Sequence, residues 1–85
     1  MNISRHEQRV LHELALGGAI HYDRCDKGKI REVTCVTREG HVLTDCTLDL
    51  FQRLKRRRFI RSQNGRPYRV TRLGITSVRA QLNQR

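Results

Sequence analysis

The stretch FIRSQNGRPYRVTRLG, residues 59–74, decides how the C-terminal part of this chain folds. Its first residues are apolar and basic, and the segment NGRP (residues 64–67) then supplies the residue types of a tight turn. Tyr68 leads out of that turn, and Thr71 with Gly74 is typical of the start of a helix. The pattern predicts a β-hairpin followed by a helix. The arginines of this hairpin suit a DNA reader, a charged contact with another protein, or a soluble edge.

Charge is distributed unevenly along the 85 residues, which carry a formal net charge of +10. Residues 1–49 hold all eight acidic residues and seven basic ones, whereas residues 50–85 hold eleven basic residues and no acidic one. The positive field therefore belongs to the part of the chain that contains the hairpin. Such asymmetry indicates a polyanionic partner, either nucleic acid or an acidic protein surface. A simpler alternative is a solvated basic face, although like charges repel one another and cost stability.

The length predicts one small domain, residues 1–85, that buries roughly 60% of the surface its unfolded chain exposes. Hydrophobic residues make up 36% of the chain and aromatic residues 5%, so we expect a thin core of Leu, Ile and Val. The N-terminus has no apolar segment typical of a signal peptide. The longest weakly polar run, residues 14–22, is much shorter than the roughly 20 residues of a membrane helix. We therefore expect a cytoplasmic protein with no membrane partner.

The N-terminal half predicts a helix followed by three strands. Ser4 and Glu7 have the spacing of a capping box at the start of a helix over residues 4–16, and the pair Gly17-Gly18 ends it. Runs rich in Ile, Val and Thr over residues 20–44, interrupted by glycine turns, predict a three-stranded antiparallel meander. Pairing across the first turn places four residues on the expected core face: Ile20, Tyr22, Val33 and Cys35.

Two further helices are predicted in the C-terminal half. Thr47 caps the first, over residues 47–58, which has an acidic residue in its first turn and arginines in its last. Its apolar stripe comprises Leu50, Phe51 and Leu54, which leaves Asp49, Gln52, Arg53 and Arg56 facing outward. Thr71 caps the second, over residues 71–82, whose apolar side comprises Ile75, Val78 and Leu82.

This order of elements resembles the second half of a winged-helix domain, in which a Y-x-x-T-x-x-G pattern opens the last helix. Tyr68, Thr71 and Gly74 occupy those positions. We therefore expect an α+β fold: a small winged-helix-like domain with three helices, an N-terminal β-meander and a C-terminal β-hairpin wing. Residues 29–46 depart from the pattern, because they predict strands where a helix-turn-helix has a helix. The element that docks a recognition helix on DNA would then be missing or remodelled.

Catalysis and metal binding find little support in the sequence. The three cysteines, Cys25, Cys35 and Cys46, lack Cys-x-x-Cys spacing and are expected to be small buried hydrophobic side chains. A metal-dependent nuclease needs clustered carboxylates, but the acidic residues are scattered and lie outside the basic half. We expect no catalytic residue, no metal site and no cofactor, and a function based on binding.

The whole chain resembles a bacterial family, the YjhX-like toxins. The resemblance rests on three segments: MNISRHEQRVLHELALGG, REVTCVTREGHVLTDCTLDLFQRLKRRRFIRSQNGRPYRV and GITSVRAQ. It implies a small non-enzymatic toxin, paired with an acetyltransferase-like antitoxin, that binds DNA topoisomerase I and hinders its binding to DNA. It supplies no site pattern at the level of single residues.

The candidate site therefore comes from the residues themselves. We expect the partner-binding surface on the basic half, centred on the arginines of the second helix, its exit and the hairpin tip: Arg53, Arg56, Arg57, Arg58 and Arg66. The planar fork of a guanidinium binds carboxylate or phosphate oxygens in pairs. The alternative is a winged-helix DNA-binding transcriptional regulator that contacts DNA through Gln52, Arg53, Arg56 and Arg66. Weak nucleic-acid binding by the toxin and a basic interaction module with another partner also stay open.

Overall fold

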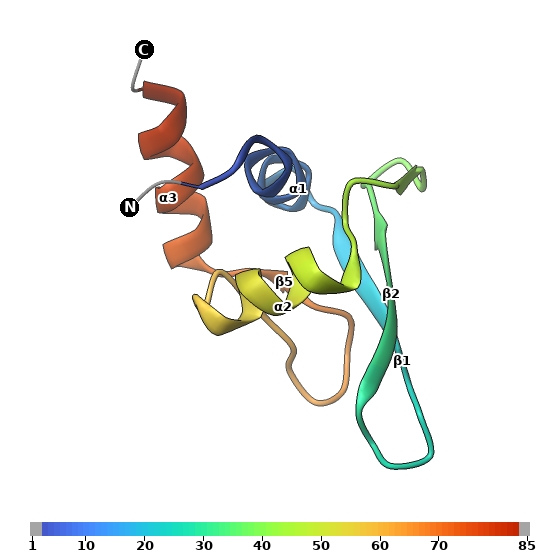
Figure 1. Ribbon diagram of the computed structural model, residues 1–85. Coiled ribbons are helices and arrows are strands. Elements are labelled where there is room, and N and C mark those ends of the chain that lie inside the picture. Colours follow the sequence, from blue (N-terminus) through green and yellow to red (C-terminus); the bar gives the residue numbers. More distant parts are fainter. Residues whose placement is uncertain (1–2, 84–85) are drawn as a thin grey trace.

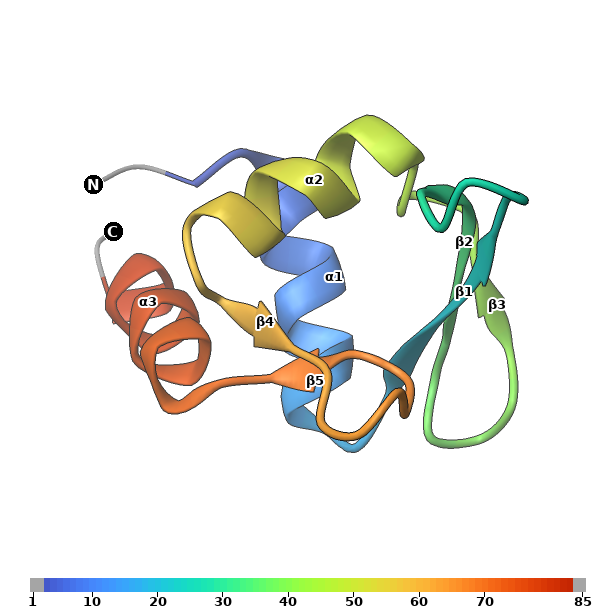
Figure 2. The ribbon, with the colours of Figure 1, turned by 90° about the horizontal axis from the view of Figure 1, so that it is seen from below.

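A computed structural model describes the backbone of residues 3–83 and the side chains of residues 3–79. These residues form an α+β fold with three helices and two small antiparallel sheets, as the sequence predicts. The elements, in chain order, are α1 (Arg5–Ala15), β1 (Ala19–Arg24), β2 (Ile30–Val36), β3 (Val42–Leu43), α2 (Leu48–Arg56), β4 (Ile60–Arg61), β5 (Arg69–Val70) and α3 (Arg72–Asn83). α1, α2 and the β4–β5 hairpin lie between α3 at one end and the meander at the other (Figures 1 and 2).

The predicted capping box begins α1. The Ser4 hydroxyl accepts a hydrogen bond from the Glu7 backbone N–H at 3.1 Å, and the Glu7 carboxylate accepts one from the Ser4 N–H at 3.0 Å. The helix ends at Ala15 and the chain reverses at Gly17, whose φ of 113° is favourable only for glycine. Both ends of α1 therefore follow from local sequence.

The predicted meander is also confirmed, with strand order β1-β2-β3. Ile20 pairs with Cys35 and Tyr22 with Val33, which is the expected register. The edge of β1 also joins the hairpin, because the N–H of Ile20 donates to the carbonyl of Tyr68 at 2.9 Å and the Tyr68 N–H donates back at 2.8 Å. Since β2 occupies residues 30–36, no helix stands where a helix-turn-helix would need one, and the likeness to a winged helix stays a prediction.

Helix α2 starts as predicted, with the Thr47 hydroxyl accepting from the Leu50 N–H at 3.2 Å. The predicted end at residue 58 is wrong, because the helix stops at Arg56 and Arg58 adopts a positive φ of 63°. The Phe59 N–H donates to the Leu54 carbonyl, and the Arg58 N–H donates to that of Lys55. These two bonds form a Schellman motif in which an arginine occupies the position that glycine prefers. The motif turns Phe59 back into the core beside Leu54.

Thr71 joins the exit of α2 to the start of α3. Its hydroxyl accepts from the Gly74 N–H at 3.1 Å and donates to the Arg58 carbonyl at 2.8 Å, while its own N–H donates to the Phe59 carbonyl. Gly74 packs against the same carbonyl so closely that a Cβ atom there would lie 2.5 Å from the Phe59 oxygen. The Thr and Gly of the Y-x-x-T-x-x-G pattern therefore each have a structural role in this fold: Thr71 caps α3, and Gly74 allows close packing on the Phe59 carbonyl.

One hydrophobic core joins all three helices with both sheets. Its seven largest fully buried side chains are Val10, Leu11, Leu14, Ile20, Cys35, Phe51 and Leu54. The ring of Tyr68 packs edge-on against Phe51, with centroids 4.9 Å apart, and so anchors the hairpin on α2. Val78 of α3 is buried and Ile75 half-buried, whereas the side chain of Leu82 lies outside the described residues.

The cysteine prediction holds for two of the three residues. Cys35 and Cys46 are buried, and Cys25 is half-buried beyond the end of β1. The thiols of Cys35 and Cys46 hydrogen-bond to each other, which raises the pKa of Cys46 well above its usual range and lowers the pKa of Cys35, with burial opposing the second shift. Within residues 3–83, no helix is long and apolar enough to cross a membrane.

Candidate partner-binding surface

The exposed side of α2 carries part of the predicted site. Arg53 and Arg56 stand three residues apart, about one helical turn, and both are exposed. Arg53 pairs with Asp49, also on α2, at 3.6 Å, and this carboxylate is itself 85% exposed. Arg56 and Arg58 form no ion pair with any described residue. These arginines can therefore be reached by a partner, as the sequence predicts.

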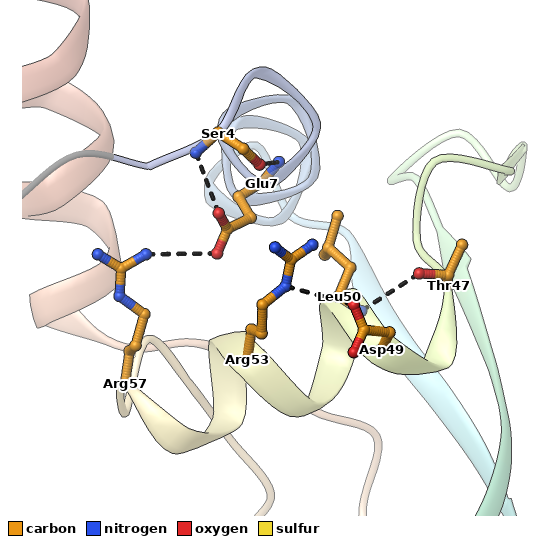
Figure 3. A network of polar contacts seen from close by, with 7 residues as sticks. All are labelled: Ser4, Glu7, Thr47, Asp49, Leu50, Arg53 and Arg57. Carbon is orange, nitrogen blue, oxygen red and sulfur yellow. Dashed lines mark hydrogen bonds and ion pairs between the residues drawn. The ribbon is translucent and has the colours of Figure 1, made fainter.

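Arg57 has a different position, because it connects α2 to α1. Its guanidinium lies 3.3 Å from the carboxylate of Glu7 and 5.0 Å from the centre of the Phe59 ring, and only 23% of its side chain is exposed. Figure 3 shows Arg53 and Arg57 rising from α2 toward α1, where Glu7 also accepts the hydrogen bonds of the capping box. We conclude that Arg57 holds the two helices together as well as adding charge to this face.

Glu7 is the one charged residue among the buried side chains of the described chain, with 4% of its surface exposed. Burial by itself raises the pKa of a carboxyl group. The hydrogen bonds from Ser4 and the positive charges of Arg53 and Arg57 outweigh this effect and lower the pKa of Glu7 below its usual value. The charged form of Glu7 is therefore stabilised at neutral pH, and its carboxylate neutralises part of the arginine charge on α2.

Arg66, the predicted site residue at the hairpin tip, lies on a second basic surface. A cleft of about 690 Å³ is lined by the hairpin, by Ala19 and His21 of β1 and by the start of α3. Four arginines line this cleft, and none of them comes from α2: Arg61, Arg66, Arg69 and Arg72. We call it the arginine cleft. The structure therefore brings Arg53, Arg56, Arg57 and Arg58 together on α2 and its exit, and separates Arg66 from them.

The surface predicted from the sequence does not include three arginines of this cleft: Arg61, Arg69 and Arg72. Their grouping depends on the hairpin register, in which Arg61 lies directly opposite Arg69. The tip is a turn in which Asn64 and Gly65 both have positive φ and the Arg66 N–H donates to the Gln63 carbonyl. If the strands paired residue by residue outward from Gln63 and Arg66, Tyr68 would lie opposite Arg61. The observed partner of Arg61 is Arg69, so the register is shifted by one residue.

The set of side chains proposed for a DNA-binding regulator is also divided. Gln52 is half-buried on α2, beside the exposed Arg53 and Arg56, whereas Arg66 lies in the arginine cleft. As described above, β2 takes the place of the helix that would precede a recognition helix. Among residues 3–83, no group of three or more His, Cys, Asp or Glu side chains is arranged to hold a metal ion. The described residues instead form two exposed arginine surfaces, one on α2 and its exit and the other at the arginine cleft.

This combination defines a small, basic α+β domain with two exposed arginine surfaces, and comparison with known proteins gives its family. Residues 1–85 match the YjhX_toxin family, described as "Putative toxin of bacterial toxin-antitoxin pair". The chain belongs to this family, and a toxin–antitoxin pair implies an antitoxin as one partner.

Similar proteins occur in several bacteria. A UPF0386 protein of Parvibaculum lavamentivorans is 59% identical over 85 residues, which is 100% of both chains. A UPF0386 protein of Aliivibrio fischeri is 56% identical, again over 100% of both chains. One of Caulobacter vibrioides is 56% identical over 100% of this chain and 93% of its own length. No solved structure matches the chain.

Proposed function

We propose that this protein is a toxin that binds DNA topoisomerase I and hinders the contact of that enzyme with DNA. Its action is binding, with no catalytic step, and it takes place in the cytoplasm. The antitoxin of the pair is acetyltransferase-like. Membership of the toxin family supports the first part of this proposal. The observation that carries the mode of action is the exposed arginine face of α2 within a segment, residues 50–85, that has no acidic residue.

The chemistry of the target explains why such a face suits this role. A topoisomerase must hold anionic DNA, and a cationic domain competes for that contact when it covers acidic or polar groups at the edge of the DNA site. Arg53, Arg56 and Arg58 offer exposed guanidinium groups from one helix and its exit. Each fork can bind two carboxylate oxygens at once, which fixes orientation as well as charge. Arg57 supports this surface by fixing α2 on α1.

The proposal is tested by relaxation of negatively supercoiled plasmid with purified topoisomerase I, together with growth of cells that express the toxin. The wild type should inhibit relaxation and arrest growth, and the double variant Arg53→Glu, Arg56→Glu should do neither while remaining folded. Lys27 and Lys29, exposed in the β1–β2 turn, offer a control with the same change in charge. If Lys27→Glu, Lys29→Glu abolishes inhibition to the same degree, net charge and not the α2 face is responsible. If the wild type leaves relaxation unchanged, the proposal is wrong.

A further inference from the structure

The arginine cleft is a second positive surface, separate from the α2 face. All four of its arginines are exposed, and none of them forms an ion pair with any described residue. No acidic residue lines the cleft. An adjoining hollow shares His21 and contains Asp23 and Glu32, so the positive surface ends at that side of β1. The cleft is therefore a bounded patch of four positive charges.

The positions of these four positive charges are unfavourable for the stability of the hairpin and of α3. Arg61 and Arg69 are direct cross-strand partners in a hairpin of two residues per strand, and like charges placed opposite each other are destabilising. Arg72 is the first residue of α3, where the helix dipole disfavours a positive charge, and the first turn of that helix has no acidic residue. Folding alone gains nothing from this arrangement, whereas a bound anion would relieve both repulsions.

We propose that the arginine cleft binds the phosphodiester backbone of a nucleic acid. This site is distinct from the α2 face and needs no topoisomerase, so it goes beyond the function proposed above. The four guanidinium groups would contact phosphate oxygens, and the Asn64-Gly65 turn would carry Arg66 against the strand at the tip of the hairpin. Contacts of this kind give affinity without reading the base sequence.

The distribution of the arginines favours a repeated anion over a single one. Arg66, Arg69 and Arg72 recur at every third residue, from the hairpin tip to the start of α3, and Arg61 lies on the facing strand. One inorganic phosphate or one carboxylate carries too little charge to offset four guanidinium groups, whereas a DNA strand presents a phosphate at about every 3.4 Å of helix axis. An acidic peptide also repeats its charges, so it serves as a competitor in the test.

The test measures fluorescence anisotropy of a short labelled DNA, as duplex and as single strand, with the purified protein over a series of salt concentrations. The wild type should bind at least one of the two forms with an affinity that falls steeply as salt rises. The double variant Arg61→Glu, Arg69→Glu should bind roughly tenfold or more weakly, with the slope of log affinity against log salt reduced by about 2. The control Lys27→Glu, Lys29→Glu should keep both the affinity and the slope of the wild type.

A second variant separates the proposed role from a structural one. Arg69→Glu alone creates an opposite charge facing Arg61, so its melting temperature should equal or exceed that of the wild type while its DNA binding is weakened. A residue kept for folding would behave in the opposite way. The proposal is overturned if the wild type binds neither form of DNA at low salt, or if the control variant loses as much affinity as the cleft variant. It is also overturned if poly-glutamate displaces DNA as well as unlabelled DNA of equal charge does.

Discussion

The carboxylate of Glu7 lies 3.3 Å from the guanidinium of Arg57, a residue 50 positions later in the chain. Glu7 makes three interactions in this position. It completes the capping box of α1, its ion pair with Arg57 joins α1 to α2, and it interacts electrostatically with Arg53. The start of the first helix and the arginine surface of the second are thereby parts of one network (Figure 3). Changes at Glu7 or Arg57 should affect folding before they affect partner binding.

Replacing Arg57 by Ala should lower the free energy of unfolding by about 1–3 kcal/mol. The reason is that the buried carboxylate of Glu7 loses a charged hydrogen-bond partner and the Phe59 ring loses a packed guanidinium. Urea denaturation at neutral pH measures the change. Arg56→Ala, one position earlier on the exposed side, is the control and should change stability by less than about 0.5 kcal/mol. Equal stability of the two variants would contradict the role assigned to Arg57.

Stability should depend on pH through Glu7. The pKa of Glu7 is lower in the folded chain than its ordinary value of 4.5, so its contribution is fully present above that value and is lost as pH falls through the folded pKa. In thermal unfolding, Glu7→Gln should therefore differ most from the wild type near neutral pH, and the difference should shrink below about pH 4.5. A difference in melting temperature that stays constant down to about pH 3 would show that the charge of Glu7 is not what stabilises the fold.

Gly74→Ala should destabilise the protein although it introduces a better helix former into α3. Alanine gains roughly 1 kcal/mol over glycine in the interior of a helix. Here its Cβ would lie 2.5 Å from the carbonyl oxygen of Phe59 and 2.8 Å from Cγ2 of Val70, so α3 must move away from the hairpin. We expect a net loss of about 1–3 kcal/mol in chemical denaturation. An increase in stability would mean that α3 packs less tightly on the exit of α2 than the structure shows.

Arg58→Gly should have the opposite effect on folding. Arg58 has a φ of 63°, which suits glycine, so the substitution should raise the free energy of unfolding by about 0.5–1 kcal/mol. Arg58→Ala removes the same side chain but keeps the unfavourable φ, and it should bring no such gain. If the side chain of Arg58 belongs to the partner-binding surface, both variants should weaken binding to topoisomerase I. A glycine variant that is less stable than the alanine variant would contradict this reading of the Schellman motif.

Much of the fold could be predicted because its signals are local. The side chains of Ser4, Glu7, Thr47 and Thr71 each accept a hydrogen bond from a backbone N–H three residues away, so these patterns can be recognised in the sequence. The meander register follows from short turns and alternating apolar residues. The sequence pattern predicts the end of α2 two residues too late, because a Schellman motif usually has glycine where this chain has Arg58.

The arginine cleft could not be predicted because its register depends on distant contacts. Pro67 has no N–H to donate to a neighbouring strand. The N–H and the carbonyl of Tyr68 both form hydrogen bonds with the backbone of Ile20, which lies 48 positions earlier in the chain. The hairpin ladder therefore resumes only at Arg69, which comes to lie opposite Arg61. The pairing of Glu7 with Arg57 is hidden in the same way, since it needs the packing of α1 on α2.

Binding of topoisomerase I by the arginine face of α2 can be measured directly by calorimetry of the two purified proteins after nuclease treatment. Nuclease removes any DNA that could bridge them through the arginine cleft. The wild type and the Lys27→Glu, Lys29→Glu control should bind with the same affinity, and Arg53→Glu, Arg56→Glu should bind roughly tenfold or more weakly. The α2 face is not the interface if that variant binds like the wild type, or if Arg5→Glu, Arg9→Glu on α1 is instead the variant that loses binding.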